Sequence, residues 1–155
     1  MNEMSFPATG RCQCGSTTYQ LLGPPLATLV CHCTDCQKLS ASSFSMTMVL
    51  AREHFELLSG ELKSWQRPTA SGGIAICWFC PECGNRIYHE DPDRPAFLKL
   101  KPGTLDDTSV ISPIGHVWTC REQPWHKHFN DLPRAETQPD LAEALKALQE
   151  GRSPF

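Results

Sequence analysis

The nine cysteines of this 155-residue chain constrain its fold more than any other feature of the sequence. Seven of them fall into three groups: Cys12-x-Cys14-Gly15, Cys31-x-Cys33-x-x-Cys36 and Cys80-x-x-Cys83-Gly84. Clustered cysteines at such spacings are typical of metal sites, whereas disulfide frameworks are typical of secreted chains. The other two, Cys77 and Cys120, are expected to be small buried side chains.

The ligand count predicts two metal sites. Structural zinc takes four ligands in a tetrahedron, so seven cysteines divide into one closed site of four and one site of three with an open position. The Cys80–Gly84 segment is typical of a turn whose two sulfurs converge on one metal ion, and its glycine permits the tight turn. In a Cys-x-Cys pair on an extended strand, both side chains point to the same face.

The spacing leaves the pairing of these groups open. Cys80/Cys83 can share a metal with Cys12/Cys14, which leaves Cys31, Cys33 and Cys36 as the open site. The same spacing also permits Cys31/Cys33 to pair with Cys80/Cys83. His32 is predicted not to be a ligand, because on a strand it faces away from its two cysteine neighbours.

Composition and charge exclude several classes of partner. The net charge of −3 indicates no nucleic-acid or anionic-membrane surface. No apolar run approaches the ~18 residues of a membrane span, and the N-terminal segment lacks the pattern of a signal peptide. We therefore expect a soluble, cytoplasmic protein of one main domain.

Hydrophobic patterning predicts a mainly β fold with antiparallel sheets. Short segments rich in alternating apolar, β-branched or aromatic residues are separated by Gly, Pro, Ser and Asp. These segments are residues 17–21, 45–50, 54–58, 73–79, 86–89 and 96–100. One helix is predicted over residues 137–151, with Thr137 as N-cap, Gly151 at its end and a leucine stripe at 141, 145 and 148. We expect residues 1–136 to form the zinc-binding domain and this helix to pack on it.

The cysteine motifs, with the residues around them, resemble the glutathione-dependent formaldehyde-activating enzyme family. The resemblance covers about residues 10 to 134. It rests on the three cysteine groups in this order together with Gly10, Tyr19 and Phe79, and it continues through Leu62-Lys63-x-Trp65, residues 103–107, His116-x-Trp118 and Pro124-Trp125. Many members have a glycine in the segment that corresponds to residues 39–44, where this chain has none. This difference predicts reduced backbone freedom beside the open site.

The resemblance implies a β-tent fold with two zinc ions per chain. It implies that Cys12, Cys14, Cys80 and Cys83 hold the structural zinc. It assigns the catalytic zinc to Cys31, Cys33 and Cys36, with solvent or a thiol completing the coordination. The implied activity is that of a carbon–sulfur lyase: glutathione or a related small thiol and a small aldehyde such as formaldehyde combine to S-hydroxymethylglutathione or a similar adduct.

The same residues also permit other interpretations. A β-tent chain can also be a non-catalytic, zinc-stabilised protein-binding module, because a fold does not settle function. If the chain is an enzyme, three thiolates make its zinc electron-rich, so a positive or donor-rich wall is needed. Lys38, Arg86 and Lys99 are candidates, although a solvated surface position is the favoured interpretation for each. The segment from His116 and Trp118 to Trp125, His126 and His128 could line a pocket, although we expect His126 and His128 to lie at the surface.

Overall fold

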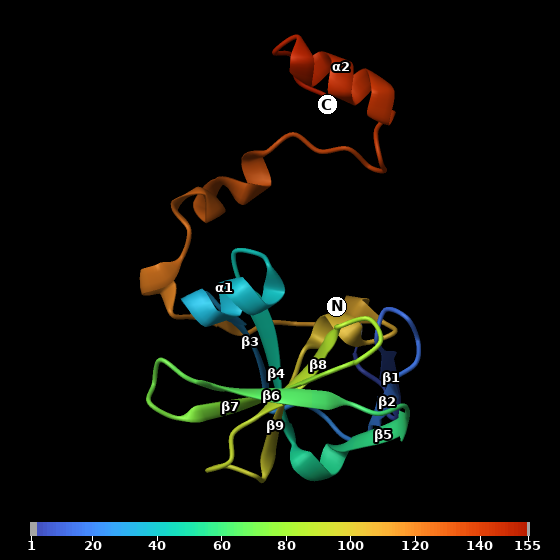
Figure 1. The fold of residues 1–155 in the computed structure, drawn as a ribbon, viewed down its shortest axis with the longest axis vertical. Coiled ribbons are helices and arrows are strands. Elements are labelled where there is room, and N and C mark those ends of the chain that lie inside the picture. Colours follow the sequence, from blue (N-terminus) through green and yellow to red (C-terminus); the bar gives the residue numbers. More distant parts are fainter. Residues whose placement is uncertain (1–2, 155) are drawn as a thin grey trace. The chain divides into compact units, whose positions relative to one another are not determined.

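The computed structural model describes residues 3–154, which form two compact units, one ending at Glu122 and one beginning at Gln123. The first unit is mainly β, as the sequence predicts (Figure 1). One α-helix of this unit, α1 (Thr34–Ser40), lies between β3 and β4 in the chain. The strands are β1 (Ala8–Arg11), β2 (Thr18–Leu21), β3 (Ala27–Cys31), β4 (Ser45–Ala51), β5 (Phe55–Ser59), β6 (Lys63–Pro68), β7 (Ile74–Phe79), β8 (Arg86–Glu90), β9 (Phe97–Leu100) and β10 (Gly115–Val117).

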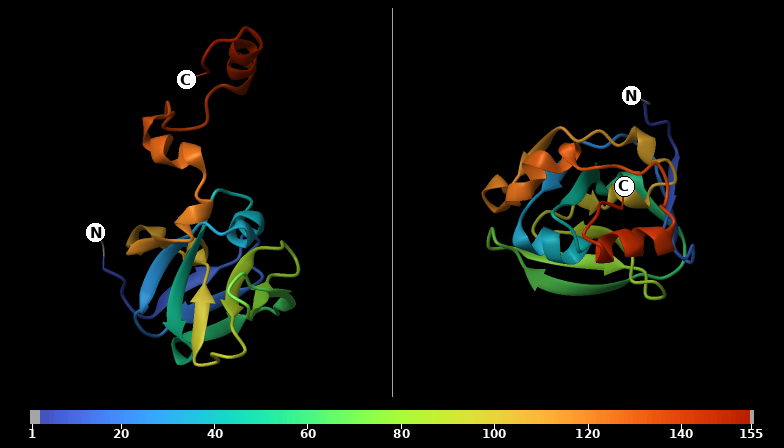
Figure 2. Two further views of the ribbon diagram at one scale, coloured as in Figure 1. Left: turned by 90° about the vertical axis from the view of Figure 1, so that its left-hand side faces the viewer. Right: turned by 90° about the horizontal axis from the view of Figure 1, so that it is seen from above.

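The strands form two sheets, which Figure 2 shows from two further directions. One sheet has the order β1-β2-β5 and the other β10-β3-β4-β9-β8-β7-β6. The pairings are antiparallel, as predicted, except that β10 pairs with β3 in parallel. Six strands overlap the segments predicted from alternation. An example of a strand that was not predicted is β6, a polar, largely exposed edge strand that ends at Pro68.

The core lies between one face of the seven-stranded sheet and the three-stranded sheet. Tyr19 and Leu21 of β2 are fully buried, and so are Leu98 and Leu100 of β9. The burial of β9 alternates because successive side chains of a strand point to opposite faces. Apolar burial on one face therefore fixes the register and directs Lys99 to the other face.

The second unit contains the 3-10 helix η5 (Pro124–Asp131) and the helix α2 (Leu141–Gln149). The Asp140 side chain caps α2 by accepting a hydrogen bond from the Glu143 N–H at 2.9 Å, so the prediction of Thr137 as N-cap was wrong. The physical reason is Pro139, which disfavours helical backbone at the residue before it. The end of the helix was predicted correctly, since Gly151 has a φ of +69° and donates to the Leu148 carbonyl.

The unit boundary after Glu122 lies earlier in the chain than the domain boundary expected at 136. Packing of α2 on the first unit stays a prediction. Within residues 3–154, no helix is both long and apolar enough to cross a membrane.

Candidate metal centres

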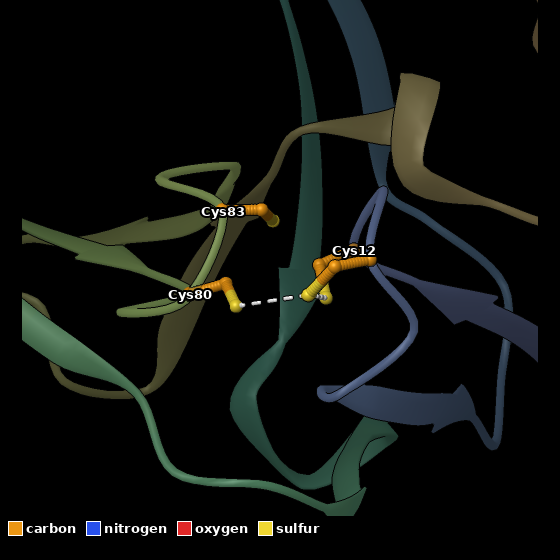
Figure 3. Close-up of side chains that lie close together, drawn as sticks. Cys12, Cys80 and Cys83 are labelled. Atoms are coloured by element: carbon orange, nitrogen blue, oxygen red, sulfur yellow. Dashed lines mark hydrogen bonds between the residues drawn. The ribbon is translucent and has the colours of Figure 1, made fainter.

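Four cysteines from two distant parts of the chain lie together in the first unit. The Sγ atoms of Cys12, Cys14, Cys80 and Cys83 are all within 4.8 Å of one another. The Cys12–Cys14 distance is 3.5 Å and the Cys14–Cys80 distance is 3.8 Å. Figure 3 shows the Cys80 and Cys83 side chains directed toward that of Cys12. Four sulfurs bound to one zinc ion at about 2.3 Å in a tetrahedron lie about 3.8 Å apart, so these residues fit a closed zinc site.

Two similar turns present these sulfur atoms. After β7, Gly84 has a φ of +74° and donates its N–H to the Cys80 carbonyl at 2.8 Å. After β1, Gly15 has a φ of +79° and donates to the Cys12 carbonyl at 3.0 Å. The expectation that Cys12-x-Cys14 lies on an extended strand was therefore wrong: β1 ends at Arg11, and a glycine in the left-handed region closes a turn.

The environment of this group favours thiolates at two positions. Burial opposes ionisation of the Cys80 thiol, but hydrogen bonds from Ser16 and from the backbone outweigh it and lower the pKa to about 5. For Cys12, a backbone hydrogen bond from Thr17 likewise outweighs burial and lowers the pKa. Zinc binds cysteine as the thiolate. The lowered pKa values of Cys80 and Cys12 therefore agree with the sulfur–sulfur distances in indicating a zinc site.

A second group, Cys31, Cys33 and Cys36, lies where β3 passes into α1. Their Sγ atoms are also within 4.8 Å of one another. Cys31 ends β3, whereas Cys33 is the N-cap of α1 and its sulfur accepts from the Cys36 N–H at 3.3 Å. The pair is therefore not on one extended strand either. A hydrogen bond between Cys36 and Cys31 lowers the pKa of Cys31 to about 5 and raises that of Cys36.

Hydrogen bonds connect the loop that carries the second group to segments distant in sequence. The Gln37 side chain donates to the His32 carbonyl at 2.7 Å and to the Arg121 carbonyl at 2.9 Å. His32 is fully buried, and its Nε2 lies 2.9 Å from Nδ1 of His116. His32 is not in the three-cysteine group.

Beside the three-cysteine group is a cavity of about 240 Å³. All three cysteines line it, and so does Trp118, whose backbone has a φ of +58°. The other side of the cavity is formed by the face of the seven-stranded sheet opposite the core. The polar side chains there include Arg67, His89, Lys99 and Lys101. None of the four cysteines of the other group lines this cavity.

Of the three candidate cations for the wall of this site, which were expected at the solvated surface, only Lys99 lines the cavity. Lys38 is exposed on α1, and Arg86 lies over the rings of Trp65 and Phe79 at 5.6 and 5.4 Å. Lys101, which also lines the cavity, was not predicted from the sequence. Its Nζ donates to the hydroxyls of Ser45 and Thr47 at 3.2 Å each. The one sequence signal for its position was the alternation of Leu98, Lys99, Leu100 and Lys101, which places the two lysines on one face.

Burial and neighbouring charges perturb two of these groups. The pKa of Lys101 is lowered by burial, against the opposing influence of Cys36 and Cys31. Burial and the charges of Lys101 and Arg67 lower the pKa of His89 to about 2, so this imidazole is neutral. The cavity therefore combines sulfur donors on one side with cations and a neutral histidine on the other.

Cys77 and Cys120 belong to neither group of cysteines. Cys77 is buried, as expected, but Cys120 is exposed, so the prediction of a buried side chain was wrong there. In the second unit, His128 is exposed and lies 3.5 Å from Asp131, and His126 stacks on Phe129.

Comparison with known proteins agrees with the cysteine pattern. The family described as glutathione-dependent formaldehyde-activating enzyme matches residues 7–121, which is most of the chain. A crystal structure of a Rhodobacter sphaeroides protein is similar in fold, with a TM-score of 0.54 and 19% sequence identity, over 70% of this chain and 99% of that one. A comparison with curated proteins gave no match.

Proposed function

Because the chain belongs to the glutathione-dependent formaldehyde-activating enzyme family, we propose that it is a zinc-dependent carbon–sulfur lyase that joins a small thiol to a small aldehyde. One observation carries the proposal: the three-cysteine group lines a cavity, while the four-cysteine group is closed by its own ligands. Three protein ligands and one open position are typical of catalytic zinc, and four are typical of structural zinc.

In this proposal the two groups have separate roles. Cys12, Cys14, Cys80 and Cys83 hold a structural zinc that joins the turn after β1 to the turn after β7. Cys31, Cys33 and Cys36 hold the catalytic zinc beside the cavity. We expect two zinc ions per chain and activity in a reducing cytoplasm, where thiols persist.

The chemistry needs a thiolate and a carbonyl carbon in contact. Zinc, when bound, supplies a binding position at which a thiol of ordinary pKa ~8.5 ionises near neutral pH. The sulfur forms a bond to the carbonyl carbon, the C=O π pair moves to oxygen, and the oxygen takes up one proton. The product is a hemithioacetal such as S-hydroxymethylglutathione, and the reverse reaction breaks the carbon–sulfur bond.

The chain's own residues position these reactants. Gln37 links the His32 carbonyl, within the cysteine loop, to the Arg121 carbonyl of a segment distant in sequence, which keeps Cys31 and Cys33 at the cavity. Lys101 is anchored by two hydroxyls on the opposite wall and places a positive charge there. In a site of low dielectric such a charge lowers the energy of negative charge that develops on sulfur or oxygen.

The first experiment is the zinc content per chain, followed by an assay with glutathione and formaldehyde. Two zinc ions per chain and adduct formation are expected. One zinc ion per chain, with no thiol-dependent activity, would contradict the proposal and favour the zinc-stabilised binding module.

Two variants separate the roles of the groups. Cys36→Ser should abolish activity and remove one zinc ion while the chain stays folded. Cys80→Ser should prevent folding, because structural zinc contributes about 10–16 kcal/mol in small zinc domains, as much as a whole domain's stability. A folded Cys80→Ser protein with two zinc ions would refute the division.

A further inference from the structure

The wall opposite the three cysteines is cationic because of the register of the seven-stranded sheet. Lys99 pairs with Val49 of β4 on one side and with His89 of β8 on the other. Residues in register share a face of the sheet, and Lys101 follows Lys99 by two positions. This face lies opposite the one that packs Leu98 and Leu100 into the core.

The carboxylates that line the cavity already have arginine partners. Asp35 accepts from Arg67 at 3.0 Å, and Glu90 lies 3.2 Å from Arg52. Within residues 3–154 no carboxylate forms an ion pair with either lysine of the wall, and Lys101 contacts only neutral hydroxyl groups. The two lysines of the wall therefore have no carboxylate partner, and the negative groups that act on Lys101 are the Cys36 and Cys31 sulfur atoms, whose charge a bound zinc ion would partly offset.

Two buried nitrogen atoms of residues that line the same cavity have no hydrogen-bond partner. They are Nε of Arg67 and Nε2 of His89. Buried polar groups are nearly always paired, and the exceptions call for an explanation such as a missing ligand. The unpaired Arg67 nitrogen and two lysines without a carboxylate partner on one wall indicate a site for an acceptor that carries negative charge.

We propose that Lys99, Lys101 and Arg67 form a subsite for a carboxylate of the thiol substrate, which makes the protein selective for anionic thiols. The proposal rests on the proposed function, because the substrate's sulfur must lie at the three-cysteine group. A carboxylate accepts two or more hydrogen bonds, and its charge-assisted bonds to lysine and arginine are stronger than bonds between neutral groups.

The size of the cavity suits this arrangement. Its volume of about 240 Å³ lies below the roughly 300–1,000 Å³ of sites for drug-sized ligands. A small mercapto acid, or the thiol end of a larger one, therefore matches it. A cationic thiol is disfavoured, because its amine would face the lysines.

The test compares two nearly isosteric probes, 3-mercaptopropionate and 3-mercaptopropionamide, by calorimetric titration of the zinc-loaded full-length protein. The wild type should bind the carboxylate at least tenfold more tightly, as expected for hydrogen bonds to a charged group. The comparison needs no mutation, so it tests the proposal even if a variant fails to fold.

Variants of the lysines in the wall test whether these residues cause the preference for the carboxylate probe. Lys101→Met should reduce the ratio of the two affinities by about tenfold, and Lys99→Met should reduce it by a smaller factor, because Lys99 is exposed. Lys63→Met is the matched control: this lysine is exposed on β6, does not line the cavity, and should leave the ratio unchanged. Comparing the ratio between each variant and the wild type cancels the difference in intrinsic pKa of the two thiols.

The other outcomes are separable. Equal affinity for the two probes in the wild type would overturn the subsite and leave the proposed function standing. Binding of neither probe by a protein with two zinc ions would overturn the proposed function itself. If Lys101→Met and Lys99→Met each kept two zinc ions per chain with an unchanged affinity ratio, the lysines would not recognise the carboxylate, and the subsite would be refuted.

Discussion

Gly10 of β1 is a position where one added methyl group should damage both the core and the four-cysteine group. A Cβ atom built at this residue would lie 2.3 Å from Cζ and Oη of Tyr19 and 2.8 Å from the Thr104 carbonyl oxygen. Ordinary contacts begin near 3.4 Å, so the ring would have to move by about 1 Å. Tyr19 is fully buried, and it is stacked on Phe55 with 5.2 Å between ring centroids.

The cost of Gly10→Ala follows from these contacts. Overpacking a core costs about 1–3 kcal/mol. Moving the ring also breaks the 2.7 Å hydrogen bond between the Tyr19 and Thr104 hydroxyls, which adds about 1 kcal/mol. The total of about 2–4 kcal/mol corresponds to a fall of about 1–2 M in the urea midpoint for a domain of this size. Because Cys12 follows two residues later, we also expect faster loss of zinc to a chelator.

Gly103→Ala is the matched control for urea unfolding, since a Cβ atom there meets nothing within 4 Å and the glycine has no positive φ. It should change the free energy of unfolding by less than about 0.5 kcal/mol. If Gly10→Ala and Gly103→Ala had equal midpoints, the packing argument for β1 against Tyr19 would be refuted.

Three further perturbations test other parts of the structure. Because the pKa of His89 is lowered to about 2, the unfolded chain binds a proton below pH ~6.5 that the folded chain does not. The free energy of unfolding should therefore fall as the pH drops below 6.5, by about 2 kcal/mol at pH 5. An equal fall in a His89→Leu variant, measured by urea unfolding, would contradict this. Ala41→Gly should raise the unfolding free energy by about 0.5–1 kcal/mol, because Ala41 has a φ of +48° at the C-cap of α1; an unchanged thermal midpoint would count against strain there. A strong chelator should unfold the protein as it removes the more tightly held zinc, and retention of the far-ultraviolet circular dichroism spectrum after complete zinc removal would count against a structural role.

The absence of glycine from residues 39–44 shows how a sequence departure becomes a structural feature. The segment contains the left-handed residue that ends α1, a position that glycine fills without strain. Here Ala41 occupies it, and its N–H donates to the Lys38 carbonyl. The helix that carries Cys36 thus ends in a conformation that costs this chain some stability.

Local sequence signals were sufficient to predict several elements of the fold. Alternating apolar residues located six strands, and Gly151 marked the end of α2. The spacing of seven cysteines predicted one group of four and one of three, which is how the sulfur atoms lie; their roles as zinc ligands stay a proposal. α1 was not predicted, because seven residues within a cysteine loop show too little periodicity.

The side chains that face the three-cysteine group depend on the pairing of strands and could not be read from local sequence. Lys99 and Lys101 alternate with buried leucines, a pattern that by itself indicates a solvent-facing strand surface. Only the pairing of β9 between β4 and β8 places that face at the cavity of Cys31. Likewise, the turns that carry Cys14 and Cys80, 66 residues apart in sequence, meet because their strands pack on one core. Periodicity along one strand fixes which side chains share a face, but the partner of that face depends on contacts between strands distant in sequence.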